Sequence, residues 1–183
     1  MGDDATAAAL AAQDGDPAAA ARFVRATQAD VWRLCANLGD RAEADDLTQE
    51  TFFRAFRALP RFAGRSSART WLLAIARRVC ADHVRDRRRR PPVEAVAAVP
   101  DNPNGTDLAT APDLGDGVAL RALLARLEPE RREAFVLTQV VGLSYAEAAE
   151  VCGCPVGTIR SRVARARDHL VTELTARPDA GSA

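Results

Sequence analysis

The sequence predicts an all-α protein of two small helical domains joined by a flexible acidic linker. Three observations lead to this prediction. Apolar residues recur at spacings of three and four along most of the chain, which is the period of an amphipathic helix. Residues 91–117 contain five Pro and three Gly without such a period, as is typical of a linker. No alternation of apolar and polar residues lasts long enough to predict a β-sheet.

The composition is that of an ordinary water-soluble protein. The chain has 183 residues, 48% of them hydrophobic and 27% charged, which suffices for two small cores. It begins Met1-Gly2-Asp3-Asp4, without the basic start of a signal peptide, and has no run of eighteen apolar residues. We therefore expect a cytoplasmic protein, outside any membrane, whose four cysteines are reduced thiols.

Changes of composition divide the chain into five expected units. Small and polar residues open it, and the linker separates two blocks with helical periodicity. The expected units are a disordered N-terminus (1–16), a first domain (17–90), the linker (91–117), a second domain (118–176) and a loose tail (177–183).

Three helices are expected in the first domain. One spans residues 17–38, and a second runs from about residue 43 to 59 and ends before Pro60. After a loop, Thr70 is expected to cap a third helix over residues 71–87. The apolar positions of the first helix are Phe23, Val24, Thr27, Val31, Leu34, Cys35 and Leu38.

The net charge of zero hides an uneven distribution. Residues 61–90 carry ten Arg against two acids, whereas residues 91–117 carry five acids and no base. Such segregation indicates separate tasks for the two segments, so the zero average does not exclude a nucleic-acid partner.

The second domain contains the start of a helix-turn-helix pattern. A helix over about residues 129–141 is expected first, and Ser144 and Glu147 then have the spacing of a capping box. The box opens a short helix over residues 145–151. A tight Cys-Gly-Cys turn follows, and Pro155 suits the first position of the next helix.

The last helix of this pattern has an apolar stripe and a basic face. In a helix-turn-helix the second helix lies in the major groove, where Arg can read guanine and Ser or Thr can reach bases or phosphates. The alternative is a basic face that is only solvated. The expected buried stripe is Val156, Ile159, Val163, Ala166 and Leu170, and the outer face is Thr158, Arg160, Ser161, Arg162, Ala164, Arg165 and Arg167.

The second helix of the first domain carries an acidic face. Asp46, Gln49 and Glu50 are three and four residues apart and so share one side. On a chain with a basic nucleic-acid reader, such a face is better suited to a protein than to DNA, although charged helix faces are often only solvated.

Three motifs, in this order, resemble the extracytoplasmic-function sigma factors of bacterial RNA polymerase, in particular their actinobacterial members. Residues 45–52 (DDLTQETF) are similar to the motif that grips the clamp helices of the polymerase β′ subunit. Residues 69–77 (RTWLLAIAR) resemble the segment that melts and reads the −10 element. Residues 154–167 (CPVGTIRSRVARAR) resemble the −35 recognition helix. The resemblance covers about residues 17–175.

The resemblance implies a non-catalytic subunit that binds core polymerase and opens promoters. Its implied partners are core RNA polymerase (β′ clamp helices and β flap) and double- and single-stranded promoter DNA. An anti-sigma protein is a further candidate partner, and the sequence leaves open whether one acts here. The implied site residues are Asp46, Gln49 and Glu50 for core binding; Arg61, Phe62, Arg65, Ser66, Ser67, Trp71, Arg77, Arg78 and Arg85 for the −10 element; and Thr158, Arg160, Ser161, Ala164, Arg165 and Arg167 for the −35 element.

Within that assignment the loop over residues 62–67 would hold a flipped non-template base. For Trp71 we favour plain core packing over a DNA contact. Some relatives have an aromatic residue where this chain has Ala164, and an acidic or amide residue where it has Arg65 and Arg69. The acidic linker either mimics RNA phosphates on the way to the RNA exit or only keeps the segment soluble.

Other classes fit the sequence less well. Cys152 and Cys154 are separated by one residue, which is too close for a usual zinc pair, so we expect no metal and no cofactor. No Gly-rich phosphate loop or nucleophile–base pairing predicts an enzyme. A stand-alone helix-turn-helix regulator remains as the alternative, but it leaves the acidic face and the loop over residues 62–67 unexplained.

Overall fold

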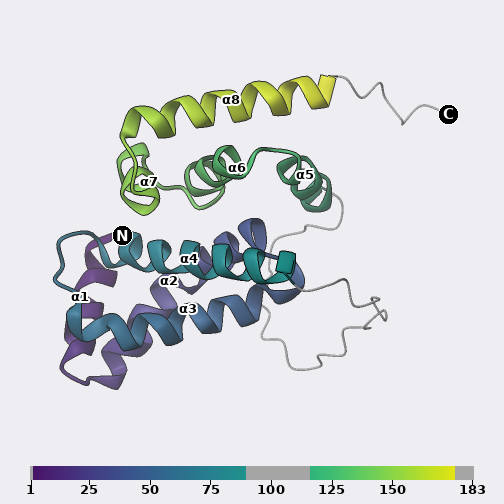
Figure 1. The fold of residues 1–183 in the computed structure, drawn as a ribbon. Coiled ribbons are helices and arrows are strands. Elements are labelled where there is room, and N and C mark those ends of the chain that lie inside the picture. The colour runs from purple at the N-terminus through teal and green to yellow at the C-terminus, as the bar shows by residue number, and fades with distance from the viewer. Residues whose placement is uncertain (1, 90–115, 176–183) are drawn as a thin grey trace, which may run out of the picture.

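The computed structural model describes residues 2–89 and 116–175, and within them it contains helices and no strand (Figure 1). The first domain consists of the helices α1–α4, and α5–α8 lie as a second layer on the side of α4. The α-helices are α1 (Gly2–Gln13), α2 (Pro17–Leu38), α3 (Ala44–Ala58), α4 (Ala68–Arg89), α5 (Asp116–Ala125), α6 (Pro129–Phe135), α7 (Tyr145–Cys152) and α8 (Val156–Thr175).

The all-α prediction is confirmed, and two boundaries lie partly outside the described residues. The linker was predicted to extend to residue 117, but residues 116 and 117 already belong to α5. The rest of the expected linker and the expected tail over residues 177–183 fall outside the described residues. No helix in the described ranges combines the length and apolarity needed to cross a membrane.

The core of the first domain forms where α2, α3 and α4 pack together. Phe23 and Leu34 of α2 and Leu72 and Leu73 of α4 are almost fully buried there. The Phe23 and Phe52 rings pack edge to face, with 6.3 Å between ring centroids and an interplanar angle of 81°, a favourable arrangement for two aromatic rings. The three helices predicted for this domain are therefore confirmed.

The expectation of a disordered N-terminus over residues 1–16 is wrong for residues 2–13, which form α1. Ala5, Ala8 and Ala9 of α1 are buried in the domain core. The helix was missed because its core residues are alanines, which give little hydrophobic contrast around the helix. Alanine nevertheless has the best helix propensity, and it lets neighbouring helices approach closely.

The cap of α4 also differs from the prediction. Ser67, not Thr70, caps the helix: its hydroxyl oxygen accepts a hydrogen bond from the Thr70 backbone N–H at 3.0 Å. Thr70 lies inside the first turn and is buried, and its hydroxyl is 2.8 Å from that of Ser67. Both residues are good caps by type, so only the three-dimensional structure distinguishes them.

The helix-turn-helix is confirmed in its local details. The Ser144 hydroxyl accepts from the Glu147 backbone N–H at 3.2 Å, and the Glu147 carboxylate accepts from the Ser144 N–H at 2.8 Å. Hydrogen bonding from the Ser144 side chain, and to a lesser extent from its backbone N–H, lowers the pKa of Glu147. Gly153 then ends α7 in the left-handed conformation, at φ 65°, which favours glycine.

Three details of this domain depart from the prediction. Val156 is 39% exposed and does not belong to the buried stripe, whereas Ile159, Val163, Ala166 and Leu170 are buried as predicted. Pro155 precedes α8 by one residue, and its carbonyl accepts from the Thr158 N–H at 2.9 Å. The helix predicted over residues 129–141 becomes π-helical at Val136–Val140.

Two glycines provide a matched test of the packing. A Cβ on Gly39 would lie 2.5 Å from Leu47 Cδ1 and 2.9 Å from the Cys35 carbonyl oxygen, whereas one on Gly157 would meet nothing within 4 Å. We predict that Gly39→Ala lowers the free energy of unfolding by about 1–3 kcal/mol. Gly157→Ala should raise it by about 0.5–1 kcal/mol, since Ala replaces Gly within a helix.

Denaturant titration of the full chain checks both values. Both tryptophans, Trp32 and Trp71, lie in the first domain, so their fluorescence reports Gly39→Ala, and circular dichroism reports Gly157→Ala. An unchanged tryptophan transition for Gly39→Ala would contradict the close packing of α2 on α3.

Candidate nucleic-acid interface

The outer face of α8 presents the residues predicted to read DNA. The helix packs on α6 and α7, and its buried stripe turns toward them. In Figure 1 it forms the edge of the second layer farthest from the first domain. Thr158 is half-buried, and the other predicted readers are exposed: Arg160, Ser161, Ala164, Arg165 and Arg167.

The arginines of α8 differ in whether they already have partners. Arg160 and Arg165 make no ion pair within the described ranges. Arg167 donates to the Gln139 side-chain oxygen at 2.7 Å. Arg162 turns back into the domain and pairs with Glu130 of α6. Sequence alone placed Arg162 on the outer face, and the structure gives it a structural role.

The loop between α3 and α4 exposes part of the predicted −10 site and buries another part. Arg61 and Arg65 are exposed, while Ser66 and Ser67 are half-buried. Phe62 is buried, and its ring lies 4.9 Å from that of Trp71, centroid to centroid. Phe62 and Trp71 therefore form the floor of the loop, which for Trp71 agrees with the packing role that we favoured.

The basic residues of α4 also fall into two groups. Arg78 is exposed, and Arg85 is exposed and pairs with Asp82 at 2.6 Å. Arg77 is half-buried, and its Nε donates to Glu133 Oε1 of α6 at 2.5 Å. This hydrogen bond raises the pKa of the Arg77 guanidinium. The predicted −10 residues of α4 thus lie along one helix but not all on one free surface.

The acidic face of α3 is present as predicted, with one addition. Asp46 and Gln49 are exposed. Glu50 pairs with Arg54 at 2.7 Å, and Arg54 also pairs with Asp82 of α4 at 2.9 Å. Sequence reasoning missed Phe53, which is 58% exposed and lies three and four residues after Glu50 and Gln49. The sequence could have identified Phe53, because it is a large apolar residue on the same helix face as the polar Gln49 and Glu50.

The comparisons with known proteins match both domains to one family. The family models "Sigma-70 region 2" and "Sigma-70, region 4" match residues 23–90 and 117–170. The chain is 56% identical over 174 residues to the ECF RNA polymerase sigma factor SigC of Mycobacterium tuberculosis, covering 95% of this chain and 92% of that protein. The chain belongs to the ECF sigma factors of RNA polymerase.

Two solved structures share the fold of this sigma factor. The structure of CnrH with the cytosolic domain of CnrY gives a TM-score of 0.75 at 25% identity, over 96% of this chain and 99% of that one. The sigma factor RpoE of Bartonella quintana, solved with the anti-sigma factor NepR, gives 0.65 at 29% identity, over 85% and 96% of the two chains. As a sigma factor, the protein serves promoter-specific transcription initiation with RNA polymerase.

In the sigma factor the two domains pack through α4 on α7, and polar contacts from α2 and α4 to the second domain add to that packing. Besides the pair of Arg77 and Glu133, Arg69 binds Asp30 at 2.7 Å within its own domain and donates to the Val141 carbonyl at 2.7 Å across the boundary. In the opposite direction, Arg132 donates to the carbonyl of Asn37 at the end of α2. We call this set of contacts the domain seam.

The thiol of Cys152 is held in an unreactive state. Cys152 lies in the domain seam, with its sulfur 3.6 Å from Glu133 Oε2, and burial raises its pKa to about 12. The thiol is therefore protonated near neutral pH and a poor nucleophile. Within residues 2–89 and 116–175 no three His, Cys, Asp or Glu side chains gather as a metal site would require.

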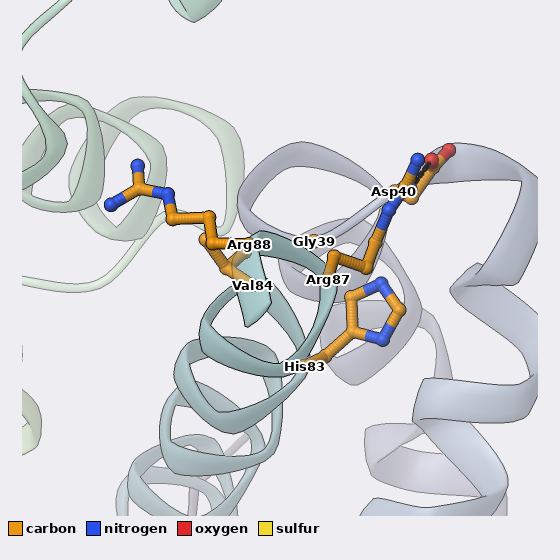
Figure 2. Close-up of a pocket in the computed structure, with 6 residues that line it drawn as sticks. All are labelled: Gly39, Asp40, His83, Val84, Arg87 and Arg88. Atoms are coloured by element: carbon orange, nitrogen blue, oxygen red, sulfur yellow. Dashed lines mark hydrogen bonds and ion pairs between the residues drawn. The ribbon is translucent and has the colours of Figure 1, made fainter. Parts of the chain in front are cut away.

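A hollow of about 280 Å³ lies where the end of α4 meets the end of α2 (Figure 2). Arg87 pairs with Asp40 on one side of it, and His83 lies beside them. The Ala42 backbone N–H, followed by Arg87, lowers the pKa of Asp40. The ion pair of Arg87 and Asp40 therefore links the end of α4 to the residue that follows α2 and Gly39.

Charge reversal at Glu133 tests the domain seam. We predict that Glu133→Lys opens the two domains, because a like charge would face Arg77 and such juxtapositions cost several kcal/mol. Small-angle X-ray scattering of the full chain should then give a larger radius of gyration. Glu130→Lys is the matched control, because Glu130 pairs with Arg162 inside the second domain. Equal radii for the wild type and Glu133→Lys, with helical content preserved, would contradict the seam.

Proposed function

We propose that the three surfaces divide the work of promoter recognition. Arg160, Ser161 and Arg165 of α8 read the −35 element, while Thr158 meets a phosphate and Ala164 leaves room or touches a thymine methyl. The observation that carries this proposal is that Arg160 and Arg165 are exposed and unpaired within the described chain, on the second helix of a helix-turn-helix. An arginine without an internal partner can bind a guanine edge without first breaking an ion pair.

The loop between α3 and α4 is our candidate for the −10 reader. The exposed Arg61, Arg65 and Arg78 neutralise phosphates, and the loop over residues 62–67 holds a flipped base above the floor of Phe62 and Trp71. Arg85 joins them when a phosphate displaces Asp82. Arg77 is blocked by Glu133 in the described arrangement, so its contact with DNA requires the domain seam to open.

We assign core polymerase binding to two surfaces. One is the acidic face of α3, and the other is the end of the second domain formed by α5 and the C-terminal part of α8. Asp46, Gln49 and Glu50 would face the β′ clamp helices. The exposed apolar residues Leu120 of α5 and Val171 and Leu174 of α8 suit the β flap. The protein would act in the cytoplasm, where its relatives act with RNA polymerase, as a specificity subunit without an active site of its own.

A protein partner that holds the sigma factor is the remaining part of this proposal. The relative from Bartonella quintana was solved in complex with an anti-sigma factor, and it shares the fold over 85% of this chain. We propose a partner of the same kind here. The alternative of a stand-alone helix-turn-helix regulator is not favoured, because it gives the first domain no task.

Reversal of Asp46 tests the polymerase surface. We predict that Asp46→Arg weakens binding to core polymerase about tenfold, which corresponds to about 1.4 kcal/mol. Its free energy of unfolding should change by less than about 0.5 kcal/mol, because the residue is exposed. Asp14→Arg, at an exposed site in the turn between α1 and α2, is the control with the same charge change. Equal affinity of Asp46→Arg and the control in a titration of labelled core polymerase would refute the assignment.

Two arginines of α8 separate specificity from affinity. Arg160→Ala should relax the base preference at one −35 position, because a bidentate contact to guanine discriminates by roughly 1–3 kcal/mol. Arg167→Ala should weaken binding about equally on all sequences and reduce the salt slope by about one. The assay uses single-base variants of a cognate −35 element with each holoenzyme. A uniform loss for Arg160→Ala, with the rank order of variants unchanged, would show that this residue does not read bases.

A further inference from the structure

Helix α1 contacts the beginning of the loop that connects α3 and α4. The Gln13 side-chain amide donates one hydrogen bond to the Leu59 carbonyl at 2.7 Å and another to the Phe62 carbonyl at 2.6 Å. These two carbonyls lie where α3 has ended and the loop starts. One side chain, 46 residues before the first of them, therefore holds the backbone on which the loop is built.

The same helix touches the middle and the end of the loop. A Cβ on Gly64 would lie 3.9 Å from both Leu10 methyl groups, so Leu10 lies beneath the loop's left-handed turn at φ +64°. The Thr6 hydroxyl oxygen accepts from the Ala68 backbone N–H at 3.0 Å, at the first residue of α4. Figure 1 places α1 at the end of the domain where this loop turns.

We infer that α1 is a positioning element of the −10 reader, with Gln13 and Thr6 holding the two ends of the base-holding loop. The inference rests on the proposed function of that loop. Residues 63–65 are all exposed, so the loop has little packing of its own to define its shape. The contacts from α1 fix the shape of the loop before DNA binds, and a loop that is already ordered loses less conformational entropy on binding. Residues 2–13 also lie before the segment that matches sigma-70 region 2.

Helix α1 has two separable roles, one in packing the core and one in positioning the loop. The buried Ala5, Ala8 and Ala9 serve the core, whereas the Gln13 and Thr6 side chains hydrogen-bond to the backbone at the two ends of the loop. Loss of the core role would weaken every activity of the first domain. Loss of the positioning role would change the reading of one base and leave core polymerase and −35 binding as they are.

The variants are chosen to remove donors or acceptors at constant shape. Gln13→Met keeps the length of the side chain but loses both N–H donors. Thr6→Val removes the hydroxyl and keeps the branching, and Thr6→Ser retains the hydroxyl as the conservative rescue. Gln28→Met, on a half-buried position of α2, is the control with the same substitution.

The assay measures how the assembled holoenzyme distinguishes bases in single-stranded −10 DNA. The probe is a fluorescent non-template oligonucleotide that carries each of the four bases, or an abasic site, at each −10 position in turn. We expect Gln13→Met and Thr6→Val to reduce the preference for the best base over the abasic site at one position about fivefold or more. Stacking of one base supplies a factor of roughly five to a hundred. Thr6→Ser and Gln28→Met should behave as the wild type.

Two other readouts make the outcome decisive. Affinity for core polymerase and for a −35 duplex should stay within about twofold of the wild type, and tryptophan fluorescence should show a folded domain at the assay temperature. If Gln13→Met and Thr6→Val keep the wild-type preference, or lose every activity in proportion, the inference is overturned. If the wild type itself shows no preference over an abasic site at any position, the proposed function of the loop fails instead.

Discussion

The burial of one face of α4 is the constraint on which the rest of the structure depends. Leu72, Leu73 and Ala76 fix the rotation of this helix in the first domain. Because that stripe is buried, the arginines of α4 must lie on its remaining faces. Arg78 and Arg85 face solvent, and Arg77 faces the second domain. The first turn of the same helix carries the end of the loop between α3 and α4. The burial of this one stripe therefore determines where the loop ends, which arginines face solvent and which arginine faces the second domain.

The domain seam contains Arg77, which we propose also contacts promoter DNA. A carboxylate and a phosphate both accept from a guanidinium, so Arg77 can exchange Glu133 for a phosphate without being left unpaired. The Arg77 and Glu133 side chains retain 33% and 15% of their exposure, so the pair is only partly desolvated. The seam also includes apolar packing, since buried residues of both domains belong to one continuous cluster and α4 packs on α7, so opening must separate apolar as well as polar contacts.

The parts of the fold that depend on neighbouring residues were predictable from the sequence, and those that depend on distant contacts were not. The helix-turn-helix was predicted correctly because Ser144 and Glu147 form its capping box and Gly153 forms its turn, all within ten residues of sequence. Helix α1 was missed, since its buried face is alanine and its value lies in contacts with residues 46 to 62 positions away. The domain seam could not be predicted either, because the sequence does not distinguish the half-buried Arg77 from the exposed Arg78.

The arginines of this chain show why basic composition alone cannot locate a nucleic-acid surface. Arg162 and Arg160 are two residues apart on the same helix, yet one is tied to Glu130 and the other is free of internal partners in the described chain. Arg132 is still more deeply engaged, and burial lowers its pKa. An arginine already bound to a carboxylate must give up that bond before it can bind a phosphate. On our proposal the unpaired Arg160 and Arg165 therefore contact bases most directly, while Arg162 holds the shape of the domain that presents them.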